Sequence, residues 1–297
     1  MVLKNQHISL QRFNNGVLRP SDMHAAKGKL TYAVLSIIMI CYLVVVFVPV
    51  IWMVLLCFKS PAEIYSKTPS FFPQTMDIKK LAELWKHFEI YKYYLNTTIM
   101  GLGCVASNII IDGFAGYAVS RLKPRGYRGY FMLVSMMMLM PATCAMIPNY
   151  MLYKSLGLLN TYFPIWLMAG VNMFSILLYK SAFDGVSMSL IEAAHIDGAD
   201  SVTIFIKVVV PISVPVIATN SIFIFNQSFG DFFWPYLLIT NPDKMVMGVK
   251  LFMIKNSTMS MDEQMMTALF AILPQIVIFV AFQRYIMGGI SLGGVKE

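Results

Sequence analysis

Asn226, Asp231 and Trp234 are side chains that could recognise a small polar ligand, and they stand at the end of an apolar segment rich in phenylalanine. Amide and carboxylate groups hydrogen-bond hydroxyls, and an aromatic face can cover the apolar side of a sugar ring. The combination therefore suits a polyhydroxylated ligand. Trp and Phe also collect at membrane–water interfaces as an aromatic belt, and composition alone favours that second interpretation.

Residues 187–207 form a polar interruption between two apolar segments, and their pattern predicts two short helices. Ser189-x-x-Glu192 has the spacing of a capping box, in which the Ser and Glu side chains satisfy free backbone N–H groups at a helix start. Gly198 stands at the expected end of this first helix, because glycine is common just past a helix C-terminus.

A second helix, capped by Asp200 or Ser201, is expected to run through Phe205. In the first helix, the small side chains of Ala193 and Ala194 would let another surface approach closely. Two short helices between apolar segments are typical of a docking surface rather than of a membrane crossing. We therefore expect a partner protein to bind this stretch.

The sequence contains no pattern for catalysis or for cofactor binding. It lacks the Gly-x-x-x-x-Gly-Lys-Ser/Thr loop that cradles nucleotide phosphates, which excludes ATP binding of that kind. The His-Glu-x-x-His metal motif is missing as well. The four cysteines lie inside apolar runs without metal-ligand spacing, which indicates small buried side chains. We expect neither enzyme activity nor a cofactor or metal in this chain.

The composition is that of a membrane protein. Apolar residues make up 58% and charged residues only 13%, and the mean hydropathy is +0.66. A typical soluble domain has about 25% charged residues. The net charge of +8 could indicate nucleic-acid binding. Positively charged cytoplasmic loops explain it more simply, so we expect no nucleic-acid partner.

Several apolar runs are long enough to cross a bilayer, which takes about 20 helical residues. The predicted fold is an all-α membrane protein, with a tail at residues 1–30 and a single transmembrane domain at residues 31–297. The six predicted spans are 32–58, 95–119, 129–151, 162–183, 207–228 and 266–286. An even number of spans places both termini on one side.

All six arginines fall on the side of the membrane that would hold the two termini. The densest group runs from Arg121 to Arg128, in the predicted turn after the second span. Because cytoplasmic loops are enriched in basic residues, this distribution predicts that the N-terminus and the C-terminus are both cytoplasmic. The 187–207 stretch then faces the cytoplasm too.

Asp112 is the one carboxylate within an otherwise apolar predicted span. An ionisable group at membrane depth is costly and by default suggests a function. Two simpler explanations are favoured here. Asp112 could lie close enough to Arg121 to be hydrated, or it could pair with a partner subunit.

The 187–207 stretch resembles the signature loop of ABC importer permeases, in the form found in the carbohydrate-type second permease of maltose-like importers. The match rests on Glu192-Ala193-Ala194-x-x-Asp197-Gly198-Ala199 followed by Phe205, Pro211 and Pro215. Further matching features are Tyr94-Leu-Asn96, Ala118-Val-Ser-Arg121, Met146-Ile-Pro148, Gly157-Leu-Leu-Asn160-Thr161 and the tail Gly288–Lys296. One departure is Phe229-Gly230-Asp231, where the family usually has Trp-Asn followed by an acid.

The resemblance implies a permease subunit of an ATP-driven, binding-protein-dependent importer for a sugar or oligosaccharide in the bacterial inner membrane. The implied coupling residues are Ser189, Glu192, Ala193, Ala194, Asp197, Gly198, Ala199 and Phe205. The candidate pathway residues stay Asn226, Asp231 and Trp234. The implied partners are a second related permease, two ATPase subunits that bind ATP and Mg, and an extracytoplasmic substrate-binding protein.

Other functions fit the same features. The solute could be a polyol or glycerol phosphate instead of a sugar. A gradient-driven secondary transporter would have similar spans but would work without ATPase subunits. A structural membrane subunit would have no pathway, so changes at Asp231 or Trp234 would leave its specificity untouched.

Overall fold

The computed structural model describes residues 26–294, with gaps at 69, 75, 77 and 256–257. Its regular elements are all helical, labelled η where they are π- or 3₁₀-helical. In chain order they are α2 (Ala26–Phe58), α3 (Pro61–Ile64), α4 (Ile78–His87), α5 (Ile90–Ser107), η2 (Asn108–Asp112), α6 (Gly113–Tyr117), η3 (Ala118–Leu122), α7 (Tyr127–Met137), η4 (Ala142–Ala145), α8 (Met146–Ser155), α9 (Phe163–Ala169), α10 (Met173–Asp184), α11 (Met188–Ile196), α12 (Ser201–Ile204), η5 (Phe205–Val209), α13 (Val210–Gly230), α14 (Phe233–Leu238), η6 (Pro242–Lys244), α15 (Met247–Lys255) and α16 (Met261–Gly294).

Among the described residues, four helical stretches are long and apolar enough to cross a bilayer: Lys29–Phe58, Ile90–Leu122, Ser201–Gly230 and Met261–Gln283. Helices α9 and α10 form a fifth if counted as one span bent by 48°. The predicted all-α class and multi-pass character are confirmed. The predicted tail at residues 1–30 lies outside the described residues up to residue 25, and α2 begins at Ala26.

The predicted span 129–151 is divided into two helices. Helix α7 ends at Met137, and α8 begins at Met146 after the short η4. Pro141, at the start of η4, has an extended backbone (φ −58°, ψ 130°). Proline supplies no backbone N–H and disfavours helix in the residue before it, which explains the break within an otherwise apolar run.

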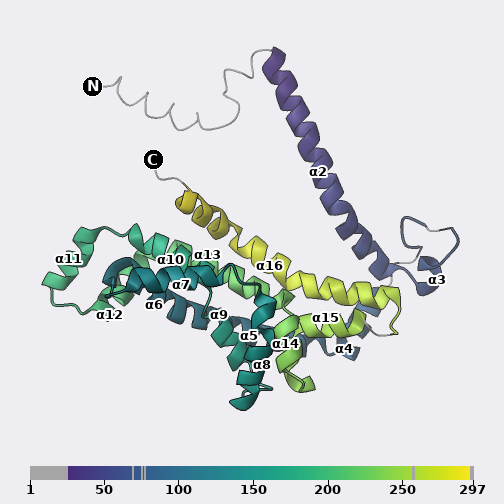
Figure 1. Ribbon diagram of the computed structural model, residues 1–297. Coiled ribbons are helices and arrows are strands. Elements are labelled where there is room, and N and C mark those ends of the chain that lie inside the picture. Colours follow the sequence, from purple (N-terminus) through teal and green to yellow (C-terminus); the bar gives the residue numbers. More distant parts are fainter. Residues whose placement is uncertain (1–25, 69, 75, 77, 256–257, 295–297) are drawn as a thin grey trace.

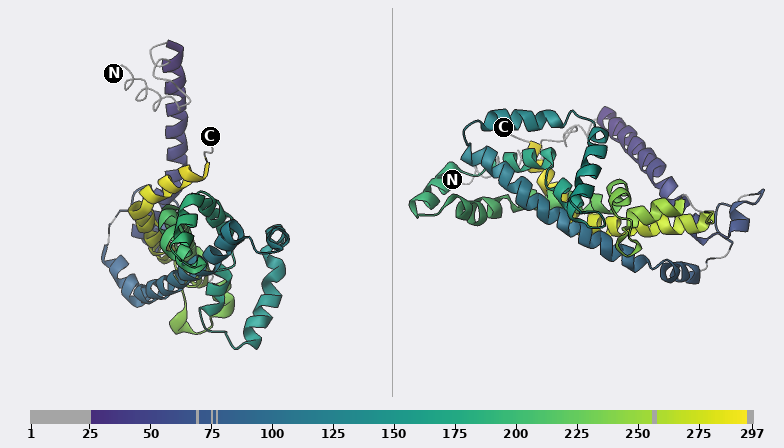
Figure 2. Two further views of the ribbon diagram at one scale, coloured as in Figure 1. Left: turned by 90° about the vertical axis from the view of Figure 1, so that its left-hand side faces the viewer. Right: turned by 60° about the horizontal axis from the view of Figure 1, so that its bottom comes forward.

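Helix α2 projects away from the other helices and contacts α16 near its Phe58 end (Figures 1 and 2). None of its most apolar 18-residue window is buried. A helix that is apolar on all sides needs lipid or another apolar surface around it. This exposure is therefore consistent with a membrane-embedded subunit.

The remaining helices form an elongated bundle in which α13 packs against α5 and α16, and α10 packs against α6 (Figure 1). One end of the bundle carries α11 and α12, and the opposite end carries α3, α4 and α15. Residues 201–230 run without a helix break from the α12 end toward the middle of the bundle. The predicted span 207–228 therefore begins six residues earlier than expected, at Ser201.

Gly116 allows α6 and α10 to approach each other closely. An added Cβ at this position would lie 2.9 Å from Tyr179 Cβ, 3.2 Å from Lys180 N and 3.3 Å from Ile176 O. Two of these three neighbours are backbone atoms, which cannot move without displacing α10. The close approach of α6 and α10 therefore requires glycine at position 116.

We predict that Gly116→Ala destabilises the folded protein by about 1–3 kcal/mol, the usual cost of overpacking a close contact. The measurement is the midpoint of thermal unfolding of the purified full-length chain in detergent. Gly129→Ala in α7 is the matched control, since nothing lies within 4 Å of a Cβ added there. Equal midpoints for the two variants would contradict the close-packing argument.

Candidate functional site

Residues 187–207, which we call the elbow, protrude at one end of the bundle as α11, a turn, α12 and the start of η5 (Figure 1). The exposed part of the elbow includes Glu192, Ala193 and Asp197, whereas Ala194 and Ala199 are half-buried. Large apolar side chains are exposed on it too: Ile196 is 87% exposed. An exposed apolar and acidic tip is suited to contact with a partner.

The predicted Ser189–Glu192 capping box is wrong. Helix α11 begins at Met188, and its N-cap residue is Ser187, whose side chain makes no capping hydrogen bond. Ser189 therefore lies in the first turn, where its Oγ is 2.7 Å from Ser187 Oγ. The helix starts earlier because Ser187 already has the non-helical backbone that a cap requires.

The turn between α11 and α12 is as predicted. Gly198 has φ +80°, and its N–H bonds the carbonyl of His195 at 3.0 Å. Asp200 caps α12 by accepting the Thr203 N–H at 3.2 Å. Hydrogen bonding from Thr203 lowers the pKa of Asp200. Helix α12 does not end at Phe205 as expected, since η5 and α13 continue it.

Phe205 is buried rather than presented to a partner. Its ring lies 4.6 Å from that of Phe114, 4.9 Å from Tyr117 and 5.8 Å from Phe183. Ile191 of α11 is buried in the same apolar cluster. This cluster joins the elbow to α6 and α10, so Phe205 positions the elbow.

Arg121 also positions the elbow, a role that the sequence did not indicate. Its Nε donates to the Phe183 carbonyl at 3.0 Å, and its NH2 group donates to the carbonyls of Phe183 and Val186. These carbonyls stand at the C-terminal end of α10, where a cation is favourable. Nearby, Asp184 accepts from Ser120 Oγ and pairs with Lys180, each at 2.6 Å.

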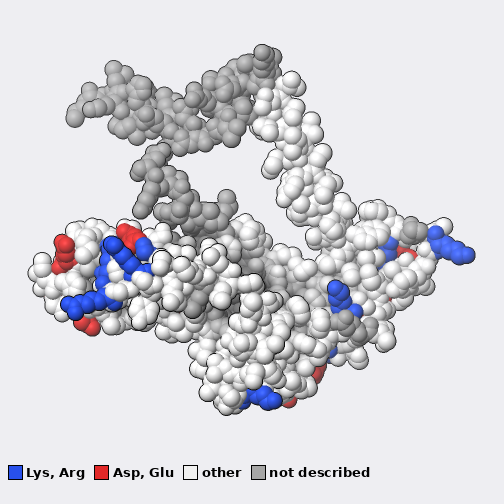
Figure 3. Space-filling model, viewed as in Figure 1, with Lys and Arg blue, Asp and Glu red and all other residues white. Residues whose placement is uncertain are grey.

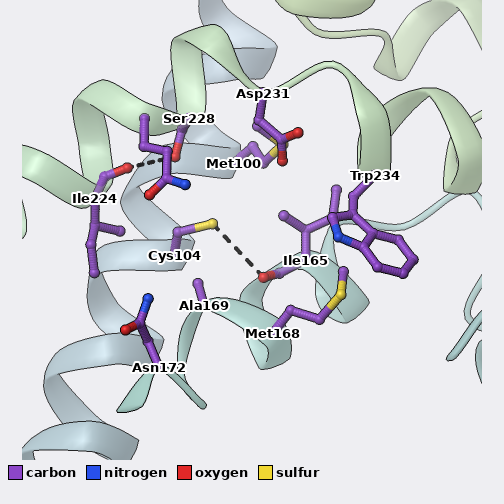
Figure 4. A pocket seen from close by; sticks show the side chains of 11 residues that line it. Met100, Cys104, Ile165, Met168, Ala169, Asn172, Ile224, Ser228, Asp231 and Trp234 are labelled. Carbon is purple, nitrogen blue, oxygen red and sulfur yellow. Dashed lines mark hydrogen bonds between the residues drawn. The ribbon is translucent and has the colours of Figure 1, made fainter. Parts of the chain in front are cut away.

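The three predicted pathway residues lie together around two adjoining hollows of about 170 and 420 Å³. Asp231 and Trp234 line both, and Asn226 lines the larger one, whose volume is in the range of small-molecule sites, roughly 300–1,000 Å³. Figure 4 shows the smaller hollow between Asn172 at one end and Asp231 and Trp234 at the other. The Oδ1 atom of Asn226 is buried without a hydrogen-bond partner.

The two hollows together are called the cavity. Sequence reasoning missed several residues from other helices that line it. Among these further lining residues are Met100 and Cys104 of α5, Met168 beside the α9–α10 bend, and Gln275 of α16. No local motif marks them, because each is one apolar or amide residue in an apolar helix.

Asp112 is fully buried and belongs to a polar cluster that joins three helical segments. Its Oδ2 accepts from Asn108 Nδ2 at 2.5 Å, and both of its oxygens lie 3.2 Å from the backbone N of Asn172. Asn172 is the N-cap of α10 and also lines the smaller hollow. Both favoured explanations for Asp112, hydration near Arg121 and pairing with another subunit, are thus wrong: its partners lie within the chain.

The cluster extends to α13 through Asn220. Asn220 Nδ2 donates to Asn108 Oδ1 at 2.9 Å and to Ser175 Oγ at 3.1 Å, and Tyr179 OH donates to Asn108 Oδ1 at 2.7 Å. These four side chains are at most 2% exposed. Helix α13 therefore follows directly after the elbow, joins the polar cluster through Asn220 and lines the cavity near its C-terminal end.

At the end of the bundle away from the elbow, Asn160 and Asn96 hold the loop around η6. Asn160 Oδ1 accepts the N–H groups of Thr240 and Asn241 at 2.7 and 2.9 Å. Asn96 Nδ2 donates to the carbonyls of Asp243 and Met245 at 2.8 and 2.9 Å. A hydrogen bond from Lys92 lowers the pKa of Asp243. The loop is thereby fixed in shape.

Comparison with known sequences identifies the family. Residues 112–291 match the family described as "Binding-protein-dependent transport system inner membrane component". This match covers more than half of the chain. The protein belongs to this permease family. It is accordingly a multi-pass inner-membrane component of such a transport system.

The permease is similar to curated relatives over most of its length. The probable ABC transporter permease protein YurM of Bacillus subtilis is 28% identical over 86% of this chain and 85% of its own. The maltodextrin transport system permease protein MdxG of the same organism is 30% identical over 69% and 75%. A crystal structure of a bacterial ABC transporter for the acidic polysaccharide alginate matches with a TM-score of 0.75 at 23% identity, over 88% of this chain and 98% of that one. The resemblance to carbohydrate-type ABC permeases is confirmed.

We predict that Asp112→Asn destabilises the permease by about 1–3 kcal/mol, because the amide oxygen must keep facing Asn108 Nδ2, which leaves the new NH₂ donor facing the backbone N–H of Asn172. Asn108 cannot turn over, since its Oδ1 already accepts from Tyr179 and Asn220. Thermal unfolding of the full-length protein in detergent measures the effect. Asp200→Asn is the control, because asparagine caps a helix as well as aspartate does. An unchanged midpoint for Asp112→Asn would show that the polar cluster is not essential.

Proposed function

We propose that this permease is one of two related membrane subunits of an ATP-driven, binding-protein-dependent importer for a sugar or oligosaccharide. The observation that carries the proposal is the unbroken helix from the exposed elbow to the cavity. The relatives are named for ABC transport and for maltodextrin transport. Contact with the sugar is therefore assigned to the cavity end of this helix. Contact with the ATP-hydrolysing subunit is assigned to its elbow end.

The elbow is the proposed contact with an ATP-hydrolysing subunit. Glu192, Ala193 and Asp197 are exposed on it, and Met188 and Ile196 add apolar surface. Phe205 and Arg121 hold the elbow to α6 and α10, so a push on α11 moves these helices with it. ATP and Mg are bound by the partner subunits in this proposal, and this chain does no chemistry.

Six crossings are proposed, with both termini in the cytoplasm. Helices α7 and α8 together supply the crossing that is broken at Pro141. The elbow and the Arg121–Arg128 turn lie at the same end of the bundle, where Lys and Arg form a group on the visible surface beside several Asp and Glu (Figure 3). Basic residues are enriched on the cytoplasmic side, which supports this orientation. The loop held by Asn96 and Asn160 then faces outward, where the substrate-binding protein would dock.

The cavity is the proposed part of the sugar pathway. Asn226, Gln227, Asp231 and Gln275 offer hydrogen-bonding groups around one hollow, and Trp234 offers an aromatic face. The unpartnered Asn226 Oδ1 would accept a hydrogen bond from a sugar hydroxyl. In the six-span proposal this chain forms half of the pathway, and the second permease completes it.

We predict that Gly198→Pro abolishes coupling, because proline cannot adopt φ +80° and removes the N–H that bonds His195. Uptake by the complete importer and its ATPase activity stimulated by the binding protein should both fall at least tenfold. Gly126→Pro is the matched control, since Gly126 also has φ +80° but lies in the Arg121–Arg128 turn, outside the elbow. Normal uptake in Gly198→Pro would contradict the role of the elbow.

We also predict that Glu192→Lys uncouples transport while leaving the amount of membrane-inserted protein unchanged. The side chain is exposed on α11, so reversal of its charge alters the docking surface without disturbing packing. Uptake and ATPase activity are measured together in reconstituted vesicles. Glu83→Lys, an exposed charge reversal on α4, serves as the control. Full stimulation of ATPase activity in Glu192→Lys would count against the proposed contact.

A further inference from the structure

Asp231 is the one charged side chain among the described residues that line the two hollows. The other polar side chains there are uncharged amides and hydroxyls, from Asn172, Asn226, Gln227, Ser228 and Gln275. A sugar in this space would therefore meet a single formal charge from the described residues of this chain, and that charge is negative.

No cation neutralises Asp231 within the described part of the chain. The ion pairs found there join Lys80 to Asp262, Lys92 to Asp243 and Lys180 to Asp184. The partners of the Asp231 carboxylate are the backbone N–H groups of Phe233 and Trp234. The negative charge of Asp231 therefore stands beside the two hollows and is not cancelled by a cation of the described residues.

The position of Asp231 is fixed by packing. A Cβ at Gly248 of α15 would lie 2.4 Å from the Asp231 carbonyl oxygen, so the two backbones are in close contact. Asp231 is also the C-cap residue of α13, with an extended backbone. The backbone that carries this carboxylate is therefore fixed beside the hollows.

We propose that Asp231 makes this pathway selective for uncharged and amino sugars and against sugars that carry a carboxylate. This inference rests on the proposed function. Two like charges about 6 Å apart, at an effective dielectric constant of about 20, repel strongly enough to weaken binding roughly a hundredfold. An amino sugar gains from the same charge. The fold itself does not decide the charge of the solute, since the structurally similar alginate importer carries an acidic polysaccharide.

The test uses the importer complex with both permeases and both ATPase subunits in lipid nanodiscs. The binding protein is omitted, so its own selectivity cannot intervene. Binding of radiolabelled galactobiose is measured, and it is displaced with unlabelled digalacturonate or with its dimethyl ester. The acid and the ester have the same rings and linkage and differ in charge.

In the wild-type complex, the ester is expected to displace galactobiose at a concentration at least tenfold lower than the acid. We call the ratio of the displacing concentrations of acid and ester the gap. In Asp231→Asn, this gap should shrink to less than threefold. Asp231→Glu keeps the charge and should keep the gap. Gln275→Lys adds a cation to the same hollow and should also close the gap, which tests the inference without altering Asp231.

Equal displacement by acid and ester in the wild-type complex would overturn the inference. A gap that persists in both Asp231→Asn and Gln275→Lys would overturn it too, because the selectivity would then lie elsewhere. If labelled galactobiose, arabinobiose and maltose all fail to bind the wild-type complex, the proposed sugar pathway itself is contradicted. Failure of the charge-selectivity inference and failure of the proposed sugar pathway therefore give different results.

Discussion

The hydrogen bonds of Asp112 are the interaction on which the rest of the permease depends. A carboxylate removed from water must have its acceptor sites filled, and Asp112 takes its donors from Asn108 and from the backbone N–H of Asn172. Those donors belong to different helical segments and meet only when the α9–α10 bend has its observed shape. The buried carboxylate of Asp112 thus fixes the α9–α10 bend, the start of α10 and the Asn172 end of the smaller hollow. Asn220 extends the constraint to α13.

Much of the fold could be predicted because the bilayer limits the choices. A crossing helix must be apolar over about 20 residues, so α2, α13 and α16 are visible as long runs. Gly198 and Asp200 were also predictable, since a positive φ and an N-cap each favour few residue types. The break before α8 was missed because the methionine run before Pro141 continues the apolar pattern without interruption.

The polar cluster could not be predicted, for a different reason. Asn108 and Asn220 are 112 residues apart in the chain, and nothing in the local sequence of either one names the other as its partner. Similarly, Asp231 and Trp234 were found from their chemical types, whereas Met100, Cys104 and Gln275 carry no local signal. Asn96 and Asn160 matched the family pattern, but only the structure shows that each binds the backbone of the loop around η6. Local patterns thus predict caps and turns, and tertiary contacts decide which distant residues meet.

The continuous helix of α12, η5 and α13 has a thermodynamic consequence. It is 30 residues long, which corresponds to about 45 Å, more than the thickness of the hydrocarbon core. If the position of the elbow changes the affinity of the cavity for its solute, then occupancy of the cavity must change the affinity of the elbow for its partner by the same factor. Solute and nucleotide are then effectors of each other. A solute in the cavity would then change how tightly the elbow binds its partner on the other side of the membrane, through the helix that joins the two sites.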